Sequence, residues 1–307
     1  MTNQFSSTQL AAFLNGQWIP RSELSIDVGD HGFVYGATVS ERLRTFGGHL
    51  FQISEHFDRL KESLEMLGLS PGNWLAKLPD QARKIVAHNY SQLQTGSDLG
   101  LVVLVTPGTS NEDSGPTVLM YTTELPFEQM NQWYGDGVSL RVSSHRQVPS
   151  NCWPSRIKCR SRMHYYLADQ EAIQQEPGAR ALLLDQNGFV AEASTANLLI
   201  YIEGQGLLSP RLDNILPGIS LGVIQTLAEK LKIPFEFGDF TVADLLRADE
   251  VLLCSTSPCV WSVRQCDGQS CGGGVAGQTL IRLQQAWSDY VGLDIVTQAA
   301  DQAAEGC

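Results

Sequence analysis

The chain has 307 residues, of which 43% are hydrophobic and 18% are charged, a composition that predicts a folded globular protein of two modest domains. Its formal net charge of −12 argues against nucleic acid or an anionic membrane as partner, because both bind clustered Lys and Arg. Seven irregularly spaced cysteines do not close into a disulfide framework, and no apolar run is long enough to span a bilayer, so we expect a cytoplasmic protein with reduced thiols.

Residues 1–124 alternate strand and helix patterns and are expected to form a small N-terminal α/β domain. Asn15-Gly16 splits two apolar runs, as a hairpin turn does. Ser54 is expected to cap a helix that ends at Gly68 and carries its apolar residues on one face. A second helix is predicted over 74–93. Two β-rich runs, GLVVLVTPG and PTVLMYTTE, follow, and the first is apolar enough for a central strand.

Residues 125–137 show neither a helical nor a strand periodicity, which predicts an interdomain linker. A larger C-terminal domain is then expected over 138–307, and it carries Lys158. Its predicted elements are a strand at 138–144, a helix at 163–175, a hairpin through ALLLD and FVAEAS, a helix at 219–231, a strand at 250–257 and a last helix at 278–291.

No single residue indicates a function by itself, because a lone lysine, glutamate or arginine is usually a solvated surface charge. Five segments taken in order are more specific. They are YGATVSERLRTFGGHLFQISEHFDRL, IKCRSRMHYYLADQEA, FVAEASTANLL, NILPGIS and LLCSTSPCV. In this order they resemble the segments of class IV aminotransferases, over nearly the whole chain. The resemblance implies an α/β protein of fold type IV, with a smaller N-terminal α/β domain, a larger β-barrel-like C-terminal domain, and pyridoxal 5′-phosphate as cofactor.

The resemblance also implies roles for individual residues. Lys158 matches the lysine that forms the Schiff base with the cofactor and then moves a proton as general base and acid. Glu192 matches the carboxylate that keeps the pyridine nitrogen protonated. Arg59 matches the arginine that binds the phosphate. The remaining cofactor contacts implied are Ser194, Thr195, Asn197, Gly218, Ile219, Ser220, Ser255 and Thr256, of which Gly218 to Ser220 begin a helix whose free amides favour an anion.

The substrate end of the pattern is less uniform. Tyr35, Ser40, Arg44 and Ser257 match positions that face the substrate in relatives. Ser40 replaces a bulky aromatic residue that branched-chain enzymes often carry, and Pro107 replaces an arginine common in D-amino acid enzymes and lyases. Met163 replaces a tyrosine of branched-chain enzymes. The substrate carboxylate is then expected at the backbone amides of 255–257, with Arg160 and Arg162 as other candidates.

Four candidate functions follow from this interpretation. The first is an aminotransferase acting between a branched-chain or similar apolar L-amino acid and a 2-oxo acid, in a homodimer or larger homo-oligomer. The second is a lyase that eliminates pyruvate from 4-amino-4-deoxychorismate. A D-amino acid aminotransferase and a non-catalytic binding protein on the same fold rank below these. No metal is expected, since Cys254, Cys259, Cys266 and Cys271 have no histidine nearby, and His31 is interpreted as structural.

Overall fold

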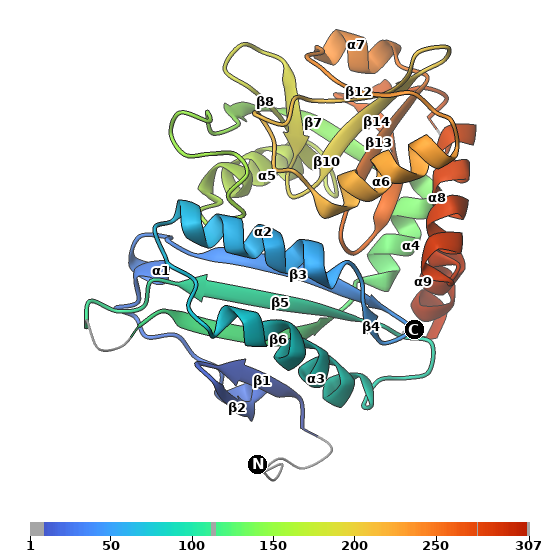
Figure 1. The fold of residues 1–307 in the computed structure, drawn as a ribbon. Coiled ribbons are helices and arrows are strands. Elements are labelled where there is room, and N and C mark those ends of the chain that lie inside the picture. The colour runs from blue at the N-terminus through green and yellow to red at the C-terminus, as the bar shows by residue number, and fades with distance from the viewer. Residues whose placement is uncertain (1–8, 112–114, 275, 306–307) are drawn as a thin grey trace. The chain divides into compact units, whose positions relative to one another are not determined.

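The computed structural model describes residues 9–111, 115–274 and 276–305 (Figure 1). The chain divides into two compact units. The first unit comprises Met1–Leu125 together with Ile157–Ser161, and the second comprises Pro126–Arg156 together with Arg162–Cys307. The short segment Ile157–Ser161, which carries Lys158, therefore belongs with the first unit, whereas the sequence placed it within the C-terminal domain.

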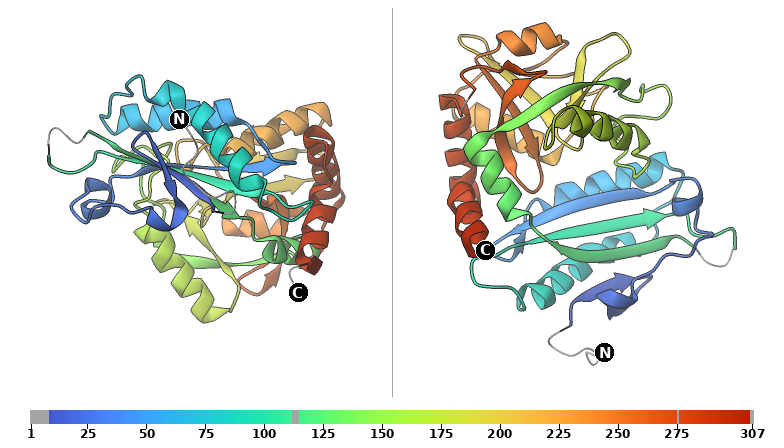
Figure 2. Two further views of the ribbon diagram at one scale, coloured as in Figure 1. Left: turned by 90° about the horizontal axis from the view of Figure 1, so that it is seen from below. Right: turned by 180° about the vertical axis from the view of Figure 1, so that it is seen from behind.

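The first unit is built on a six-stranded sheet in the order β2-β1-β6-β5-β3-β4, all pairs antiparallel. Two helices cover one face of this sheet, and the view from behind in Figure 2 shows strands β5 and β6 in front of them. The elements in chain order are β1 (Ala11–Leu14), β2 (Gln17–Pro20), α1 (His31–Val34), β3 (Val39–Phe46), β4 (His49–Leu50), α2 (Ile53–Met66), α3 (Leu78–Tyr90), β5 (Leu99–Thr106) and β6 (Thr117–Glu124).

The core of the first unit lies between the sheet and helices α2 and α3. It follows from periodicity, because alternate residues of β3 and β5 face helix residues spaced three or four apart. Its fully buried members include Val39, Leu43, Leu60, Leu64, Ile85, Leu101 and Val103. β5 is central, as predicted. The predicted cap at Ser54 is wrong: α2 already begins at Ile53, its N-cap residue is Gln52, and no side chain caps it.

The second unit contains a nine-stranded sheet in the order β12-β11-β10-β13-β14-β7-β8-β9, with β15 paired to β14. A bridge between Ala193 and Ala196 brings the end of β9 beside the start of β10, so the sheet curls back on itself in the barrel-like manner expected. Its strands are β7 (Val138–Arg146), β8 (Arg180–Leu184), β9 (Val190–Ala193), β10 (Asn197–Ile202), β11 (Gly206–Ser209), β12 (Phe235–Phe237), β13 (Glu250–Ser255), β14 (Cys259–Cys266) and β15 (Gln269–Ser270).

Six helices of the second unit are described: α4 (Phe127–Asp136), α5 (Met163–Gln175), α6 (Ile219–Lys230), α7 (Val242–Arg247), α8 (Gln278–Val291) and α9 (Ile295–Glu305). The sequence prediction matches α5 and α8 in both bounds. α9 was not predicted. None of the described helices is both long enough and apolar enough to cross a membrane.

Helix α4 replaces the irregular linker predicted at 125–137. Phe127, Met130 and Tyr134 lie three and four residues apart and form its buried face. The Tyr134 hydroxyl donates to the Pro258 carbonyl over 2.8 Å, and Trp133 stacks on Trp261 with ring centroids 5.2 Å apart. The segment is therefore a packed element of the second unit. The apolar residues of this segment therefore have helical spacing, which the linker prediction overlooked.

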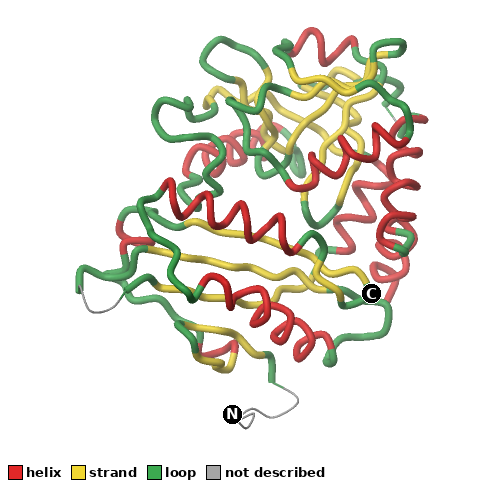
Figure 3. The backbone as a smooth tube through the Cα atoms, viewed as in Figure 1, coloured by secondary structure: helices red, strands yellow, loops and turns green. Residues whose placement is uncertain are grey.

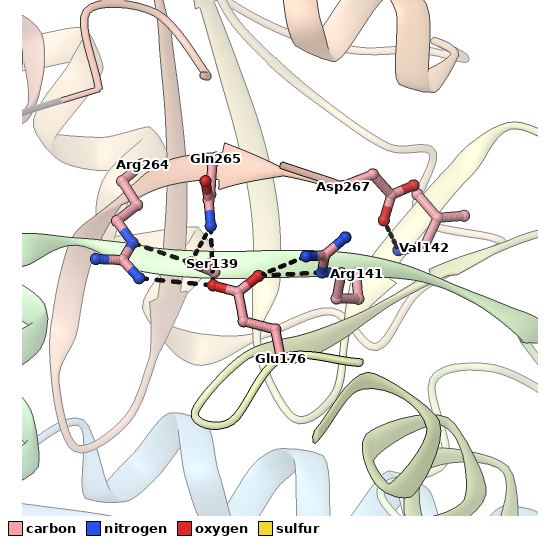
Figure 4. A network of polar contacts seen from close by, with 7 residues as sticks. All are labelled: Ser139, Arg141, Val142, Glu176, Arg264, Gln265 and Asp267. Atoms are coloured by element: carbon pink, nitrogen blue, oxygen red, sulfur yellow. Dashed lines mark hydrogen bonds and ion pairs between the residues drawn. The ribbon is translucent and has the colours of Figure 1, made fainter. Parts of the chain in front are cut away.

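A polar network fastens the end of α5 to strands β7 and β14 (Figure 4). Glu176 accepts from Arg141 Nε at 3.0 Å and from Gln265 Nε2 at 2.8 Å. Burial alone would raise the pKa of Glu176, but hydrogen bonds from Ser139, Arg141 and Gln265 outweigh burial and lower it. The carboxylate thus stays charged and ties three chain segments together.

From the end of β7 to the start of α5 the chain runs mainly as a loop, green in Figure 3, and this loop carries Lys158.

Candidate active site

Lys158 is held by its backbone against β3 and α2. The Ser40 amide donates to the Lys158 carbonyl at 2.8 Å, the Arg160 amide donates to the Thr38 carbonyl at 2.8 Å, and the Lys158 amide donates to Ser63 Oγ at 3.3 Å. A bridge between Val39 and Cys159 completes a short antiparallel pairing. The loop is therefore fixed at the lysine itself.

Ser40 lies directly opposite Lys158 in this pairing. Opposite residues of an antiparallel pair direct their side chains to the same face, so Ser40 and Lys158 share a face, while Val39 points to the helices and is buried among them. Ser40 is 2% exposed, and none of the described residues provides a hydrogen-bond partner for its Oγ. A buried hydroxyl without a partner is costly. Ser40 is therefore a candidate position for contact with a ligand.

Arg59 projects from α2 toward β3, where it forms a buried ion pair with Glu41. Its Nε donates to Glu41 Oε1 at 2.8 Å and its Nη2 donates to Oε2 at 2.7 Å, a two-pronged geometry that fixes the guanidinium plane. His56 Nδ1 lies 2.7 Å from the same Oε2. The side chains of Glu41, His56 and Arg59 are all buried. The sequence identified Arg59 but not its two partners.

Neighbouring charges shift the pKa values of Glu41 and His56. Burial would raise the pKa of Glu41, but Arg59 and His56 outweigh burial and lower it to about 2. Burial lowers the pKa of His56, which Glu41 raises and which the charges of Arg59 and Lys158 lower further. Glu41 is therefore ionised and His56 neutral at pH 7. Lys158 and Arg59, almost 100 residues apart in sequence, lie within electrostatic reach of the same histidine.

Glu192 lies in β9 of the second unit and is 3% exposed. Its Oε1 accepts two hydrogen bonds, from the Tyr165 hydroxyl and from Gln147 Nε2 at 2.5 Å. A longer contact of 3.5 Å joins Oε2 to Asn197 Nδ2. Sequence reasoning missed Tyr165 and Gln147, because nothing in their spacing from Glu192 signals a contact.

Asn197 connects Glu192 to the start of helix α6. Its Nδ2 donates to the Leu216 carbonyl at 2.9 Å. Gly218, the N-cap residue of α6, comes so close to Asn197 that a Cβ at this position would lie 2.0 Å from Asn197 Oδ1. No side chain caps α6. A helix N-terminus without a side-chain cap favours an anion, and only glycine allows this close approach.

The turn between β9 and β10 holds Ser194 and Thr195. Thr195 has φ of 63°, a left-handed conformation that non-glycine residues rarely adopt. The hydroxyls of both residues already have protein partners: Ser194 Oγ donates to Asp169 Oδ1 at 2.5 Å, and Thr195 Oγ1 accepts from Arg180 Nη2 at 3.0 Å. These bonds fix the shape of the turn. A cofactor contact by either residue stays a prediction.

Ser255, Thr256 and Ser257 follow the end of β13 in the turn to β14. Asn197 pairs with Cys254 in the sheet register, so this turn lies beside the start of β10. Three segments that are distant in sequence therefore meet in the second unit. They are the β9–β10 segment with Glu192 and Asn197, the start of α6 at Gly218, and the turn 255–257.

Arg44, one of the substrate residues expected from the sequence, lies away from Lys158 along β3. Arg44 lies four residues beyond Ser40 on β3, about 13 Å away at the spacing of a strand. It is fully buried, its Nε donates to the Thr45 carbonyl at 3.2 Å, and its guanidinium lies over the Phe46 ring. Tyr35 is 73% exposed and packs edge-on against His31. A substrate contact by Arg44 or Tyr35 stays a prediction.

The cysteines that a zinc site would use are separate thiols. Cys254 and Cys259 are buried, and burial raises the pKa of Cys266 to about 12 and that of Cys271 to about 11. Within the described ranges, no three His, Cys, Asp or Glu side chains are grouped as metal ligands.

Comparison with known proteins gives consistent matches. The model of the family "Amino-transferase class IV" matches residues 38–266. The chain is 28% identical to a D-alanine aminotransferase of Staphylococcus aureus (strain N315), covering 91% of this chain and 97% of that protein, and 29% identical to the enzyme of Bacillus licheniformis of the same name, covering 92% and 97%. Among solved structures, the branched-chain amino acid aminotransferase of Escherichia coli superposes with a TM-score of 0.79, at 24% identity, over 91% of this chain and 93% of that one. The likeness to this solved structure shows that the chain has the same fold.

Proposed function

The chain belongs to the class IV aminotransferases, a family dependent on pyridoxal phosphate, and we propose that it transfers an amino group between an apolar L-amino acid and a 2-oxo acid, with Lys158 as the catalytic residue. The observation that carries the assignment is the backbone clamp on Lys158, which fixes the lysine to β3 and α2. Two further polar clusters support it. One contains Arg59, and the other contains Glu192.

The residues present fit pyridoxal phosphate. Glu192 offers a buried carboxylate for the ring nitrogen, and the start of α6 at Gly218 has no side-chain cap. Ile219 and Ser220 would supply amides to the phosphate, and Arg59 of the first unit would supply a positive charge. When bound, the cofactor supplies a cationic ring that accepts electrons from the substrate Cα.

In this proposal Lys158 transfers one proton. Lys158 Nζ would take the proton from the substrate Cα as a general base and would then deliver it to the bound cofactor, and not back to Cα, as a general acid. Its backbone bonds to Ser40 and Ser63 hold the lysine in place while its side chain moves. The charge of Arg59 disfavours extra positive charge nearby and helps to keep His56 neutral.

Ser40 favours a wider or more polar side-chain pocket than that of a strict branched-chain enzyme, because its small hydroxyl side chain stands where such enzymes often carry a bulky aromatic residue. Pro107 provides no positive charge to grip a carboxylate. The amides of the turn 255–257 would hold the α-carboxylate. A second candidate is D-alanine, because two sequence relatives that match nearly the whole chain are named D-alanine aminotransferases.

A panel of amino acids tests the substrate. Purified holoenzyme is mixed with L-leucine, L-valine, D-alanine or D-leucine, and the conversion of the cofactor from its aldehyde to its amine form is followed by absorption. We expect the apolar L-amino acids to react about tenfold faster than D-alanine or more. Faster reaction with D-alanine would replace this proposal by the second candidate. Pyruvate released from 4-amino-4-deoxychorismate without an oxo-acid acceptor would establish the lyase.

We also propose that the protein is a cytoplasmic homodimer. The side of α5 that faces away from the buried Ala168 and Ala172 carries four exposed apolar side chains: Met163, Tyr166, Leu167 and Ile173. An exposed apolar patch marks an interface, and the cysteines within the described residues are unbridged, which supports a reducing compartment.

Sedimentation tests the dimer. We expect the wild-type protein to have twice the 33.7 kDa mass of the chain. The double substitution Tyr166→Glu and Ile173→Glu places two charges in the proposed interface and should shift the protein to monomer. Ile281→Glu, at an equally exposed isoleucine of α8, is the matched control. A wild-type monomer, or an unchanged dimer in the double variant, would contradict this use of α5.

A further inference from the structure

Two side chains donate to the same carboxylate oxygen of Glu192. Oε1 accepts from both Tyr165 and Gln147, whereas Oε2 has the 3.5 Å contact with Asn197. Two donors on one oxygen fix the rotation of a carboxylate and leave the other oxygen to point away from them. The orientation of Glu192 is therefore set by residues that sequence reasoning did not identify.

Tyr165 packs firmly in the second unit, and its hydroxyl remains a hydrogen-bond donor to Glu192. It lies on the side of α5 that packs on β8, against the cluster of Ala168, Ala172, Ala181 and Leu183. Burial raises the pKa of its phenol well above the usual value, and Glu192 raises it further. The hydroxyl thus stays protonated and remains a donor. Gln147 donates to the same oxygen and also contacts the Tyr165 hydroxyl at 3.3 Å, so the two donors hold each other.

We propose that Tyr165 and Gln147 are positioning residues that orient Glu192 so that Oε2 meets the ring nitrogen of pyridoxal phosphate. The inference rests on the proposed cofactor role of Glu192. Asn197 extends the arrangement, because its amide contacts Oε2 and also binds the Leu216 carbonyl next to the α6 start. The carboxylate for the ring and the amides for the phosphate are thereby held in one connected set of bonds.

The test compares two cofactors in the apoenzyme. One is pyridoxal phosphate, and the other is its analogue in which the ring nitrogen is replaced by C–H. We expect Tyr165→Phe to weaken binding of pyridoxal phosphate by about tenfold or more, as for loss of a hydrogen bond to a charged group, and binding of the analogue by less than about threefold. Phenylalanine keeps the packing on β8. Gln147→Leu, which removes the second donor, should show the same selectivity.

Tyr201→Phe, a substitution of the same kind on β10 of the second unit, is the matched control and should change neither affinity. Equal weakening for both cofactors would show that Tyr165 only supports packing and would overturn the proposal. Tighter binding of pyridoxal phosphate would also overturn it, because removing a donor makes the carboxylate more basic, and basicity would then outweigh position. If the wild-type protein binds neither cofactor, the proposed function itself fails, which is a distinguishable result.

Discussion

Replacement of Lys158 by alanine is expected to abolish the visible absorption of the lysine-bound cofactor and to lower transamination by about 10²- to 10⁴-fold or more. A positioned general base and acid contributes an effect of that size, and the covalent role of the lysine adds to it. The fold should survive, because the backbone bonds of residue 158 to Ser40 and Ser63 do not involve its side chain. The measurements are the absorption spectrum with pyridoxal phosphate and the rate with an amino acid and an oxo acid.

The matched control for this experiment is Lys84→Ala, at an exposed lysine of α3, which should leave the spectrum and the rate unchanged. Transamination at a near wild-type rate by the Lys158→Ala protein would remove the central claim. A wild-type protein that stays colourless after incubation with pyridoxal phosphate would favour a non-catalytic use of this fold.

Replacement of Glu41 by alanine is expected to destabilise the apoenzyme by about 3–5 kcal/mol, because it leaves the buried Arg59 without its counter-charge. Both oxygens of Glu41 bind Arg59, and one of them also binds His56. Loss of the carboxylate also frees the guanidinium to rotate, so we expect weaker binding of pyridoxal phosphate in the same variant. Urea denaturation followed by circular dichroism measures the stability.

The stability that Glu41 contributes decreases at low pH. The pKa of Glu41 is lowered from 4.5 to about 2 in the folded protein. Its stabilising contribution is therefore fully present above pH 4.5 and is lost as the pH falls toward 2. The difference in stability between the wild type and Glu41→Gln should shrink over this range.

The control for the Glu41 variants is Glu65→Ala, which removes an exposed pair with Lys61 at 3.9 Å and should cost less than about 1 kcal/mol. A loss of similar size in Glu41→Ala and Glu65→Ala would contradict the importance of the buried pair. A stability difference that does not change between pH 4.5 and 2 would contradict the lowered pKa.

Local patterns in the sequence predicted much of the fold. The bounds of α5 and α8 follow from helical periodicity, and the hairpin at Asn15 follows from a turn that needs positive φ, which the structure has at Asn15 and Gly16. The linker prediction at 125–137 was wrong although Phe127, Met130 and Tyr134 have helical spacing. α4 is only ten residues long and contains Gly135, which weakens the local helical signal.

The ordered motifs around Lys158, Glu192 and Arg59 were enough to indicate the family and its cofactor. The clamp of Lys158 on β3, the ion pair of Glu41 with Arg59, and the hydrogen bonds of Tyr165 and Gln147 to Glu192 became visible only in the folded chain. Strand register and helix packing explain this difference. Each of these contacts joins residues far apart in the chain, and which side chains meet depends on how strands pair and helices pack, which no local pattern specifies.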